Sequence, residues 1–171
     1  MVVIYHNSYQ KKSGVQLPEK NNQIPLHSSM SNWFNKNLQI EDITGIGQNT
    51  MAHFLKMEWV DVGENFLVMR MPVNERTQQP YGLLHGGASC ALAETVGSLA
   101  SHFVIDPSKF ICVGLEINAN HVRSASRGFV TALCTALHIG KSTHVWDIKI
   151  SDDSQKLICI SRLTVAILNK S

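Results

Sequence analysis

Charged side chains are scarce in this chain of 171 residues, where they make up 16% of the sequence and leave a formal net charge of +2. So small a charge does not favour binding to nucleic acid. No apolar run approaches the length of a membrane-spanning helix, and the N-terminus lacks the apolar core of a signal peptide. These absences predict a cytoplasmic protein that binds neither nucleic acid nor membrane. A low charged fraction also suits a chain that buries surface in an oligomer.

Cysteine patterns typical of disulfide frameworks and zinc sites are missing as well. No C-x-x-C pair joins the four cysteines, Cys90, Cys112, Cys134 and Cys159, which favours reduced thiols in a cytosol. The sequence contains no G-x-S-x-G elbow and no H-E-x-x-H pair, so serine hydrolases and zinc hydrolases are disfavoured. Three histidines have no partners at metal-ligand spacing, namely His53, His102 and His144. We therefore expect neither a metal nor a cofactor.

The apolar fraction of 44% is high enough for one domain with a real core. Residues 1–29 are polar and aperiodic, so we expect a flexible extension or an over-extended gene start, followed by a domain over residues 30–171. A short helix is expected from Ile40, and strands over 54–60, 65–71, 111–118, 129–139, 144–150 and 157–168. With one long helix from Gly87, this pattern predicts an α+β fold with an antiparallel sheet of five to six strands.

The stretch from Gln79 to Glu94 reads QPYGLLHGGASCALAE and is the most informative part of the chain. Pro80 and Gly82 indicate a turn, and the Gly86-Gly87 pair allows a sharp change of direction at the start of a helix. Apolar residues then recur at helical spacing, at Leu92, Val96, Leu99 and Phe103. A second face carries only small residues, Ala93, Gly97 and Ala100. We expect a buried helix against which another backbone packs closely.

Glu94 sits in this helix about two turns beyond its start. An ionised carboxylate in a mostly apolar setting is costly unless it is paired, hydrogen-bonded or used in a reaction. The free N–H groups of Gly86 and Gly87, with His85 beside them, suit an anion or a developing oxyanion. That end lies about 12 Å along the axis from Glu94, too far for both groups to act on one carbonyl. Two such helices packed antiparallel would bring them together, so the spacing predicts a dimer with two shared sites.

Together with GLEINANHVR at 114–123 and SRLT at 161–164, this stretch resembles the hotdog-fold acyl-CoA thioesterases. The resemblance covers roughly residues 30–169 and is greatest to the branch that acts on aromatic acyl-CoAs. Within that branch the sequence is most similar to members that hydrolyse 1,4-dihydroxy-2-naphthoyl-CoA in menaquinone synthesis, and next to those that proofread enterobactin assembly. The resemblance implies a hotdog fold, in which the sheet wraps around one long central helix, and a homotetramer built as a dimer of dimers.

The same resemblance implies that Glu94 either attacks the thioester carbonyl directly or activates a water. Gly86 would donate its backbone N–H to the thioester oxygen, where negative charge grows in the transition state. Three further side chains would complete the catalytic site, with Gln79 orienting the water or thioester, His85 holding or polarising it, and Ser98 reaching the same pocket one turn after Glu94. Structural roles stay open: a salt bridge for Glu94, a helix cap for His85, an exposed turn for Gln79 and a close helix contact for Ser98.

Loops at 121–128 and 138–143 carry the groups expected to bind the acyl-CoA substrate. Both place cations beside backbone N–H groups, which suits pyrophosphate and the 3′-phosphate, and in the family these segments line the coenzyme A groove. With the start of the helix, the candidates are Gly87, His121, Arg123, His138, Gly140, Lys141, Ser142 and Thr143. The alternative is that they are ordinary polar residues of turns.

The acyl group would lie in a pocket at the dimer interface, lined by Val96, Leu99 and the turn at 81–83. Its identity stays open between 1,4-dihydroxy-2-naphthoyl, other aryl groups and medium-chain acyl groups, carried by coenzyme A or by a carrier protein. Two other classes also remain. One is a non-catalytic acyl-CoA-binding protein, and the other is a hotdog dehydratase or hydratase, whose usual Asp/His pair is not found in this sequence.

Overall fold

The computed structural model describes residues 31–170, so the expected extension over 1–29 lies outside the described residues. The described part begins with two short helices, α2 (Ile40–Ile43) and α3 (Met51–Phe54), and continues into the strands β1 (Glu58–Val62) and β2 (Phe66–Pro72). A long helix, α4, follows over Gly86–Val104. The remaining strands are β3 (Phe110–His121), β4 (Phe129–Ile139), β5 (Thr143–Asp152) and β6 (Leu157–Asn169).

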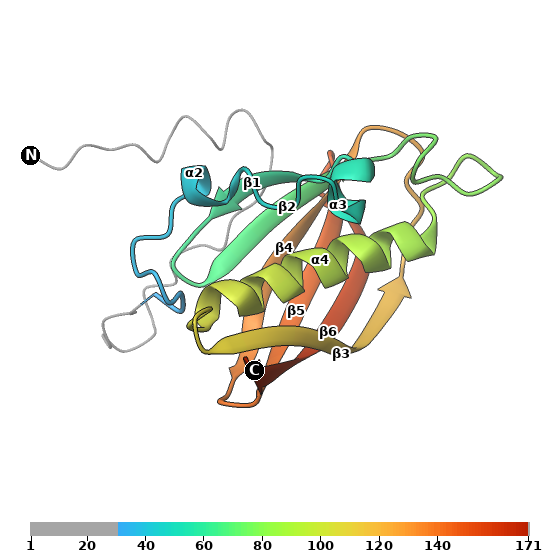
Figure 1. Cartoon of the computed structure of the whole chain (residues 1–171). Coiled ribbons are helices and arrows are strands. Elements are labelled where there is room, and N and C mark those ends of the chain that lie inside the picture. Colours follow the sequence, from blue (N-terminus) through green and yellow to red (C-terminus); the bar gives the residue numbers. More distant parts are fainter. Residues whose placement is uncertain (1–30, 171) are drawn as a thin grey trace, which may run out of the picture.

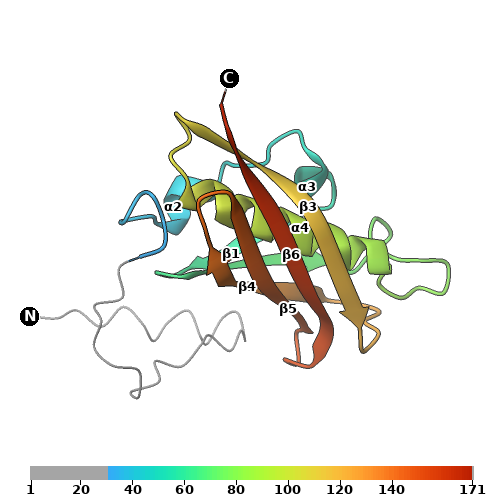
Figure 2. The ribbon, with the colours of Figure 1, turned by 90° about the horizontal axis from the view of Figure 1, so that it is seen from below.

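The six strands form one antiparallel sheet in the order β1-β2-β4-β5-β6-β3. Figure 1 shows α4 lying against one face of this curved sheet, and the view from below shows β3 at the edge, beside β6 (Figure 2). The chain therefore leaves β2, crosses the sheet through α4, and returns along β3 at the opposite edge from β1. This arrangement confirms the α+β fold with an antiparallel sheet wrapped around one long helix.

The small residues of α4 allow the sheet to approach the helix closely. Leu92, Ala93, Val96 and Ala100 are fully buried, and a Cβ added at Gly97 would lie only 2.5 Å from Leu163 Cδ2 on β6. Burying a large apolar side chain contributes roughly 1.5–3 kcal/mol, so this face fixes the rotation of α4 about its axis. Glu94 and Ser98 are then left on the side that faces β3. None of the helices within residues 31–170 combines the length and apolar character needed to cross a membrane.

The prediction that a strand begins at residue 54 was wrong. Residues 51–54 form a helical turn instead, in which Leu55 N–H donates to Met51 O at 2.9 Å, and β1 begins only at Glu58. The turn buries Leu55 in the core while Phe54 stays 67% exposed. Lys56 leaves the helical turn with a φ of +57°, which redirects the chain into the strand. The alternation of apolar and polar residues that is typical of a strand therefore holds only from Glu58 onward.

The alternation expected in 111–118 is present, but the apolar residues of its first half do not face the helix. Ile111, Val113 and Leu115 are 44%, 47% and 64% exposed, whereas Phe110 and Cys112 pack against the core. β3 is an edge strand, so its second face and its outer edge are uncovered within residues 31–170. An apolar strand at an exposed edge is a surface on which another strand can pair.

Candidate active site

His85 caps the N-terminus of α4. Its Nδ1 accepts a hydrogen bond of 2.9 Å from the backbone N–H of Gly87, and its own backbone is extended, with φ −70° and ψ 132°. When Nδ1 accepts, the neutral imidazole carries its proton on Nε2. The helix cap that the sequence left open as an alternative is therefore present, and it still leaves Nε2–H as a donor toward a ligand.

Gly86 adds a backbone donor at the same end of the helix. As the first residue of α4, its N–H has no acceptor within the helix, and no other group in residues 31–170 accepts from it. The helix dipole makes this end favourable for negative charge. A Cβ at this position would lie 2.9 Å from His121 Nε2, so the missing side chain lets the His121 imidazole lie directly beside the free amide.

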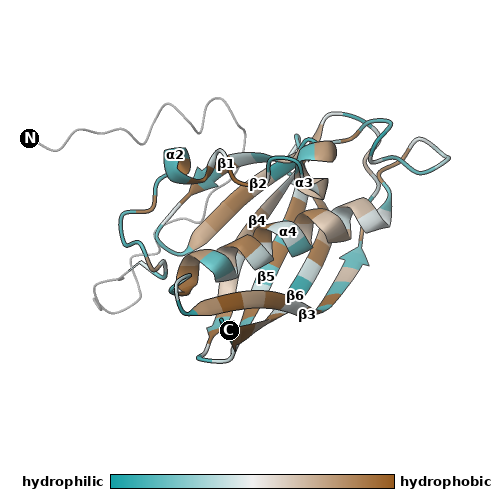
Figure 3. Ribbon diagram, in the orientation of Figure 1, coloured by the Kyte–Doolittle hydropathy of each residue, from teal (hydrophilic) through white to brown (hydrophobic). Residues whose placement is uncertain are grey.

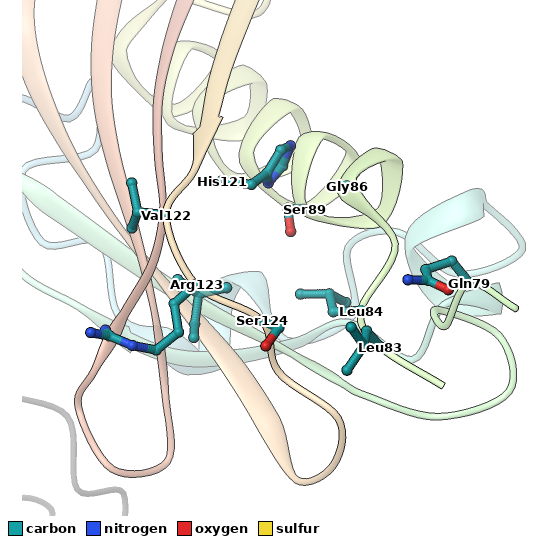
Figure 4. Close-up of a pocket in the computed structure, with 10 residues that line it drawn as sticks. Gln79, Leu83, Leu84, Gly86, Ser89, His121, Val122, Arg123 and Ser124 are labelled. Atoms are coloured by element: carbon teal, nitrogen blue, oxygen red, sulfur yellow. The ribbon is translucent and has the colours of Figure 1, made fainter. Parts of the chain in front are cut away.

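The turn before α4 holds Gln79 at the rim of this site. Gln79 N–H donates to Leu83 O at 2.8 Å, and Gly82 N–H donates to Gln79 O at 2.9 Å. The φ of Gly82 is +74°, a value that favours glycine. The side-chain Oε1 of Gln79 accepts from Tyr81 N–H, which leaves its NH₂ group toward Gly86 (Figure 4). Gln79 is thus half-buried and not fully exposed, and its side chain offers a hydrogen-bond donor.

A hollow of about 400 Å³ lies between this turn, the start of α4 and the end of β3. Figure 4 shows His121 and Ser89 beside Gly86, with Leu84 and Gln79 across the opening. The Arg123 side chain extends away from Gly86, and its Nη1 donates to Leu157 O at 2.9 Å. Four predicted site residues therefore line one hollow, namely Gln79, Gly86, His121 and Arg123.

Three lining residues were not predicted from the sequence, namely Leu84, Ser89 and Ile158, whereas Val122 and Ser124 belong to the predicted loop at 121–128. Ser89 could have been found, because it lies three residues after Gly86 and therefore on the same face of the first helical turn. Its side chain is only 1% exposed. Ile158 had no such signal, since its place beside residues 122 and 123 depends on the pairing of β3 with β6.

Glu94 lies on another part of α4 and does not line this hollow. Its half-buried side chain accepts a hydrogen bond of 3.2 Å from Ser98 Oγ to Oε1, which confirms that the two residues share a helix face. No cation in residues 31–170 forms an ion pair with it. In the described part of the chain Glu94 is therefore not a salt-bridged core residue, and about 12 Å of helix separates it from the Gly86 amide.

The thiol of Cys112 lies near Glu94 but is not a competing nucleophile. Its Sγ donates to Ser98 O at 3.5 Å, and burial raises the pKa of this thiol. Burial also raises the pKa of Cys159, which pairs with His121 across β6 and β3, to about 11. Because the thiolate is the nucleophilic form, both cysteines stay inert near neutral pH.

The second predicted coenzyme A loop lies at the other end of the sheet. In the β4–β5 turn, Gly140 N–H donates to Thr143 O at 2.9 Å, and Ile167 N–H donates to Ser142 O at 2.9 Å. Since Ala166 pairs with both Thr143 and Val113, this turn lies beside the start of β3, whereas His121 ends that strand. The structure thus separates one group of candidates, His138, Gly140, Lys141, Ser142 and Thr143, from the start of α4 (Figure 1).

A second hollow, of about 310 Å³, lies between the α2–α3 segment, β1, β2 and α4. Its apolar walls include Trp59, Met69 and Leu99, and His53 and Gln48 contribute polar groups. Leu99 thus lines a hollow within the single chain. Val96 does not, because it is fully buried in the core.

Comparison with known proteins identifies the family. Residues 81–159 match the Thioesterase superfamily. The chain is 46% identical over 133 residues to the 1,4-dihydroxy-2-naphthoyl-CoA hydrolase of Escherichia coli, a match that covers 78% of this chain and 97% of that protein. It is 39% identical over 133 residues to the proofreading thioesterase EntH of Cronobacter turicensis, with 78% and 96% covered.

Other relatives are named only in general terms, as esterases, and one from Vibrio cholerae is 49% identical over 138 residues, covering 81% of this chain and 91% of that protein. A crystal structure of a mutant thioesterase from Pseudomonas aeruginosa has a TM-score of 0.79 at 44% identity and covers 82% of this chain and 100% of that one. These similarities in sequence and fold each cover about four fifths of the chain. The chain therefore belongs to the thioesterase superfamily and is a thioester hydrolase with the hotdog fold.

Proposed function

We propose that this thioesterase hydrolyses an aromatic acyl-CoA, with 1,4-dihydroxy-2-naphthoyl-CoA of menaquinone synthesis or a related aryl-CoA as substrate. The relatives that carry this substrate in their names support the choice, since those of Escherichia coli and Listeria monocytogenes are 46% and 48% identical to the chain. The products are the free acid and coenzyme A. The four cysteines are free thiols, which suits a reducing cytoplasm.

The observation that carries the proposal is the presence on one helix of Glu94, a carboxylate with no ion pair within residues 31–170, and of Gly86, whose backbone N–H has no acceptor there. The amide would bind the thioester oxygen as negative charge develops there. Glu94 would add to the carbonyl carbon, or remove a proton from a water that adds to it. The C–S bond then breaks and the coenzyme A thiolate takes up a proton. His85 and Gln79 supply further donors to the thioester or water.

The distance along α4 requires that Glu94 works with the Gly86 end of a second chain. Figure 3 shows the first half of β3 as a hydrophobic strand at the open edge of the sheet, and its Ile111, Val113 and Leu115 are exposed. Antiparallel pairing of two β3 strands would cover these residues and continue the sheet across the dimer. It would also set two α4 helices side by side in opposite directions, with two equivalent sites.

The acyl pocket would also need the second chain. The apolar hollow with Trp59, Met69 and Leu99 lies beside β1 and β2, whereas Glu94 faces β3 at the other edge of the sheet, so the aryl group of a thioester bound at Glu94 would lie against the turn at 81–83 of the second chain. The coenzyme would extend toward the cationic loops. Because the loops at 121–128 and 138–143 lie at opposite ends of one sheet, we propose that Arg123 and Lys141 of different protomers contribute to one coenzyme A groove. A dimer of dimers would complete it.

Replacement of Glu94 by glutamine tests the function. Glu94→Gln keeps the size and the hydrogen bond from Ser98 but removes the charge, so kcat for benzoyl-CoA or 1,4-dihydroxy-2-naphthoyl-CoA should fall by about 10²- to 10⁴-fold. Release of free thiol measures the rate, and the affinity for coenzyme A should stay unchanged. The matched control is Glu41→Gln on α2, an exposed carboxylate whose loss should leave kcat intact. A Glu94→Gln variant that retains most of its kcat would remove Glu94 from the mechanism.

A further inference from the structure

The carboxylate of Glu94 lies directly against the main chain of β3 at Gly114. A Cβ added to Gly114 would overlap Glu94 Oε1 and would lie 3.1 Å from its Cδ and 3.5 Å from Oε2. In ordinary packing a Cβ stays well beyond 3 Å from such atoms. The Glu94 side chain therefore occupies the space that any other residue at 114 would fill. The backbone of Gly114 itself adopts no left-handed conformation, so this contact, and not the chain direction, is what favours glycine here.

A β-bulge brings Gly114 to the helix. The pairing of β3 with β6 shifts between Gly114 and Glu116, which leaves Leu115 as the extra residue. Before the bulge the even-numbered Phe110 and Cys112 pack toward the core, and after it the odd-numbered Ile117 and Ala119 do so. Bulges redirect side chains and are common beside active sites. Here the bulge keeps both halves of β3 packed on α4, with Gly114 as the last helix-facing residue of the first half.

The two carboxylate oxygens of Glu94 have different surroundings. Oε1 accepts from Ser98 Oγ at 3.2 Å and is also the atom nearest to Gly114. The carbonyl of Ser98 in turn accepts from Cys112 Sγ at 3.5 Å, on the same strand as Gly114. Oε1 is thus fixed between the helix and the strand. Oε2 has no hydrogen-bond partner within residues 31–170 and is therefore the oxygen that remains free to accept a hydrogen bond or to react.

We propose that Gly114 is a positioning residue of the thioesterase site, whose missing side chain lets Glu94 Oε1 dock between Ser98 and β3 so that Oε2 meets the thioester or the water. The inference rests on the proposed role of Glu94 in the reaction. It adds that the β3 main chain, and not only the helix, sets the direction of the reacting oxygen. A methyl group at 114 displaces the carboxylate by about the length of a bond, and a misplacement of about 1 Å can lower a rate by about 100-fold.

The substitution Gly114→Ala tests this directly. Glycine within a strand is unfavourable relative to alanine, and the atoms that the new methyl meets belong to the mobile end of one side chain. The variant should therefore keep or raise its melting temperature and keep the KM and the affinity for coenzyme A, while kcat falls by up to about 100-fold. The matched control is Gly45→Ala, where an added Cβ meets nothing within 4 Å and kcat should not change. An unchanged kcat in Gly114→Ala overturns the inference.

A second variant separates displacement of the carboxylate from any general damage to β3. Glu94→Asp withdraws the carboxylate by one methylene, so an alanine at 114 no longer reaches it. In the Glu94→Asp background, Gly114→Ala should then cost no more than about twofold in kcat, far less than in the wild-type background. An equal loss in both backgrounds would mean that the methyl group acts on the strand or the dimer and would overturn the inference. If Glu94→Gln itself leaves turnover intact, the proposed role of Glu94 fails instead, and the two failures are distinguishable.

Discussion

At the scale of single residues, the ionisable group of His144 is almost fully buried, whereas that of Glu94 is half-buried. His144 is 2% exposed and lies edge-on to Trp146, with ring centroids 6.3 Å apart. Its Nδ1 finds no hydrogen-bond partner within residues 31–170. Burial lowers the pKa of His144 below its ordinary value, and nearby His138 adds to the shift, although a backbone hydrogen bond with Gly140 opposes it. Near the ordinary histidine pKa, this imidazole is therefore protonated to a smaller extent in the folded protein than in the unfolded chain.

This difference predicts that stability falls as the solution becomes acidic. Below the ordinary histidine pKa of about 6.5, residue 144 binds a proton in the unfolded chain but not in the folded protein. The free energy of unfolding therefore decreases as the pH falls, until the lower pKa of the folded state is reached. His144→Leu removes this contribution. The melting temperature should drop less between about pH 7.5 and about pH 5.5 in the variant than in the wild type. The exposed His102, replaced in the same way, should leave the wild-type pH dependence intact; an unchanged dependence in His144→Leu would contradict the prediction.

At the scale of elements, α4 shows how much a periodic pattern predicts. The spacing of Leu92, Val96 and Leu99 and a second face of small residues predicted a buried helix from Gly87, and the observed helix begins one residue earlier. The strand expected over 129–139 has the observed bounds. Such elements are predictable because a single period decides both their conformation and their buried face. The resemblance then supplied the topology, which no local pattern carries.

The small-residue face of α4 gives a testable consequence for packing. Gly97→Ala should gain up to about 1 kcal/mol of helix propensity, but the new methyl group would lie 2.5 Å from the buried Leu163 Cδ2, and overpacking costs about 1–3 kcal/mol. We expect a net loss of stability in urea unfolding. Shortening the partner with Leu163→Val should relieve part of that loss, so the double variant should be more stable than the sum of the single effects predicts. Strict additivity would show that the two side chains do not meet.

Helices and strands were harder to predict where the sequence suits more than one conformation or more than one buried face. Residues 51–57 contain apolar side chains that suit a strand, yet a helical turn that follows Thr50 and ends at Lys56, where φ is positive, places Leu55 in the core. In β3 the alternation was visible, but the bulge at Leu115 reverses which residues face the helix. A bulge depends on the partner strand, so sequence alone gave no sign that Gly114 would meet Glu94. The candidate residues could be named, but not their mutual distances.

At the scale of the whole molecule, the single chain divides the candidate residues among three places. Gln79, Gly86, His121 and Arg123 surround one hollow, Glu94 and Ser98 lie further along α4, and Lys141 and Ser142 lie at the far end of the sheet. A site built from all three therefore needs more than one copy of the chain. The exposed apolar edge of β3 offers the surface on which two copies can pair. An experiment that tests the proposed reaction can therefore also test the proposed dimer.

Two variants that are each inactive alone should regain activity when one copy of each is combined in one dimer. Glu94→Gln removes the acid, and Gly86→Pro removes the backbone donor. Proline is tolerated at the first residue of a helix, and the φ of −70° and ψ of 132° at His85 suit the residue before a proline. Gly86→Ala is the matched control, because it adds a Cβ near His121 but keeps the N–H. The loss in Gly86→Pro beyond that in Gly86→Ala measures the donor itself.

If each site combines Glu94 of one protomer with Gly86 of the other, a mixed dimer holds one site with both defects and one with neither. With random pairing about half of the dimers are mixed, so co-expression of the two variants should recover about a quarter of the wild-type turnover, although each variant alone is nearly inactive. Differently tagged copies allow the mixed dimer to be purified, and its kcat should approach half that of the wild type. If both residues acted within one chain, every site in the mixture would carry one defect and no activity would return. Recovery of turnover therefore depends on the exchange of residues between protomers, and its absence would place the reaction within a single chain.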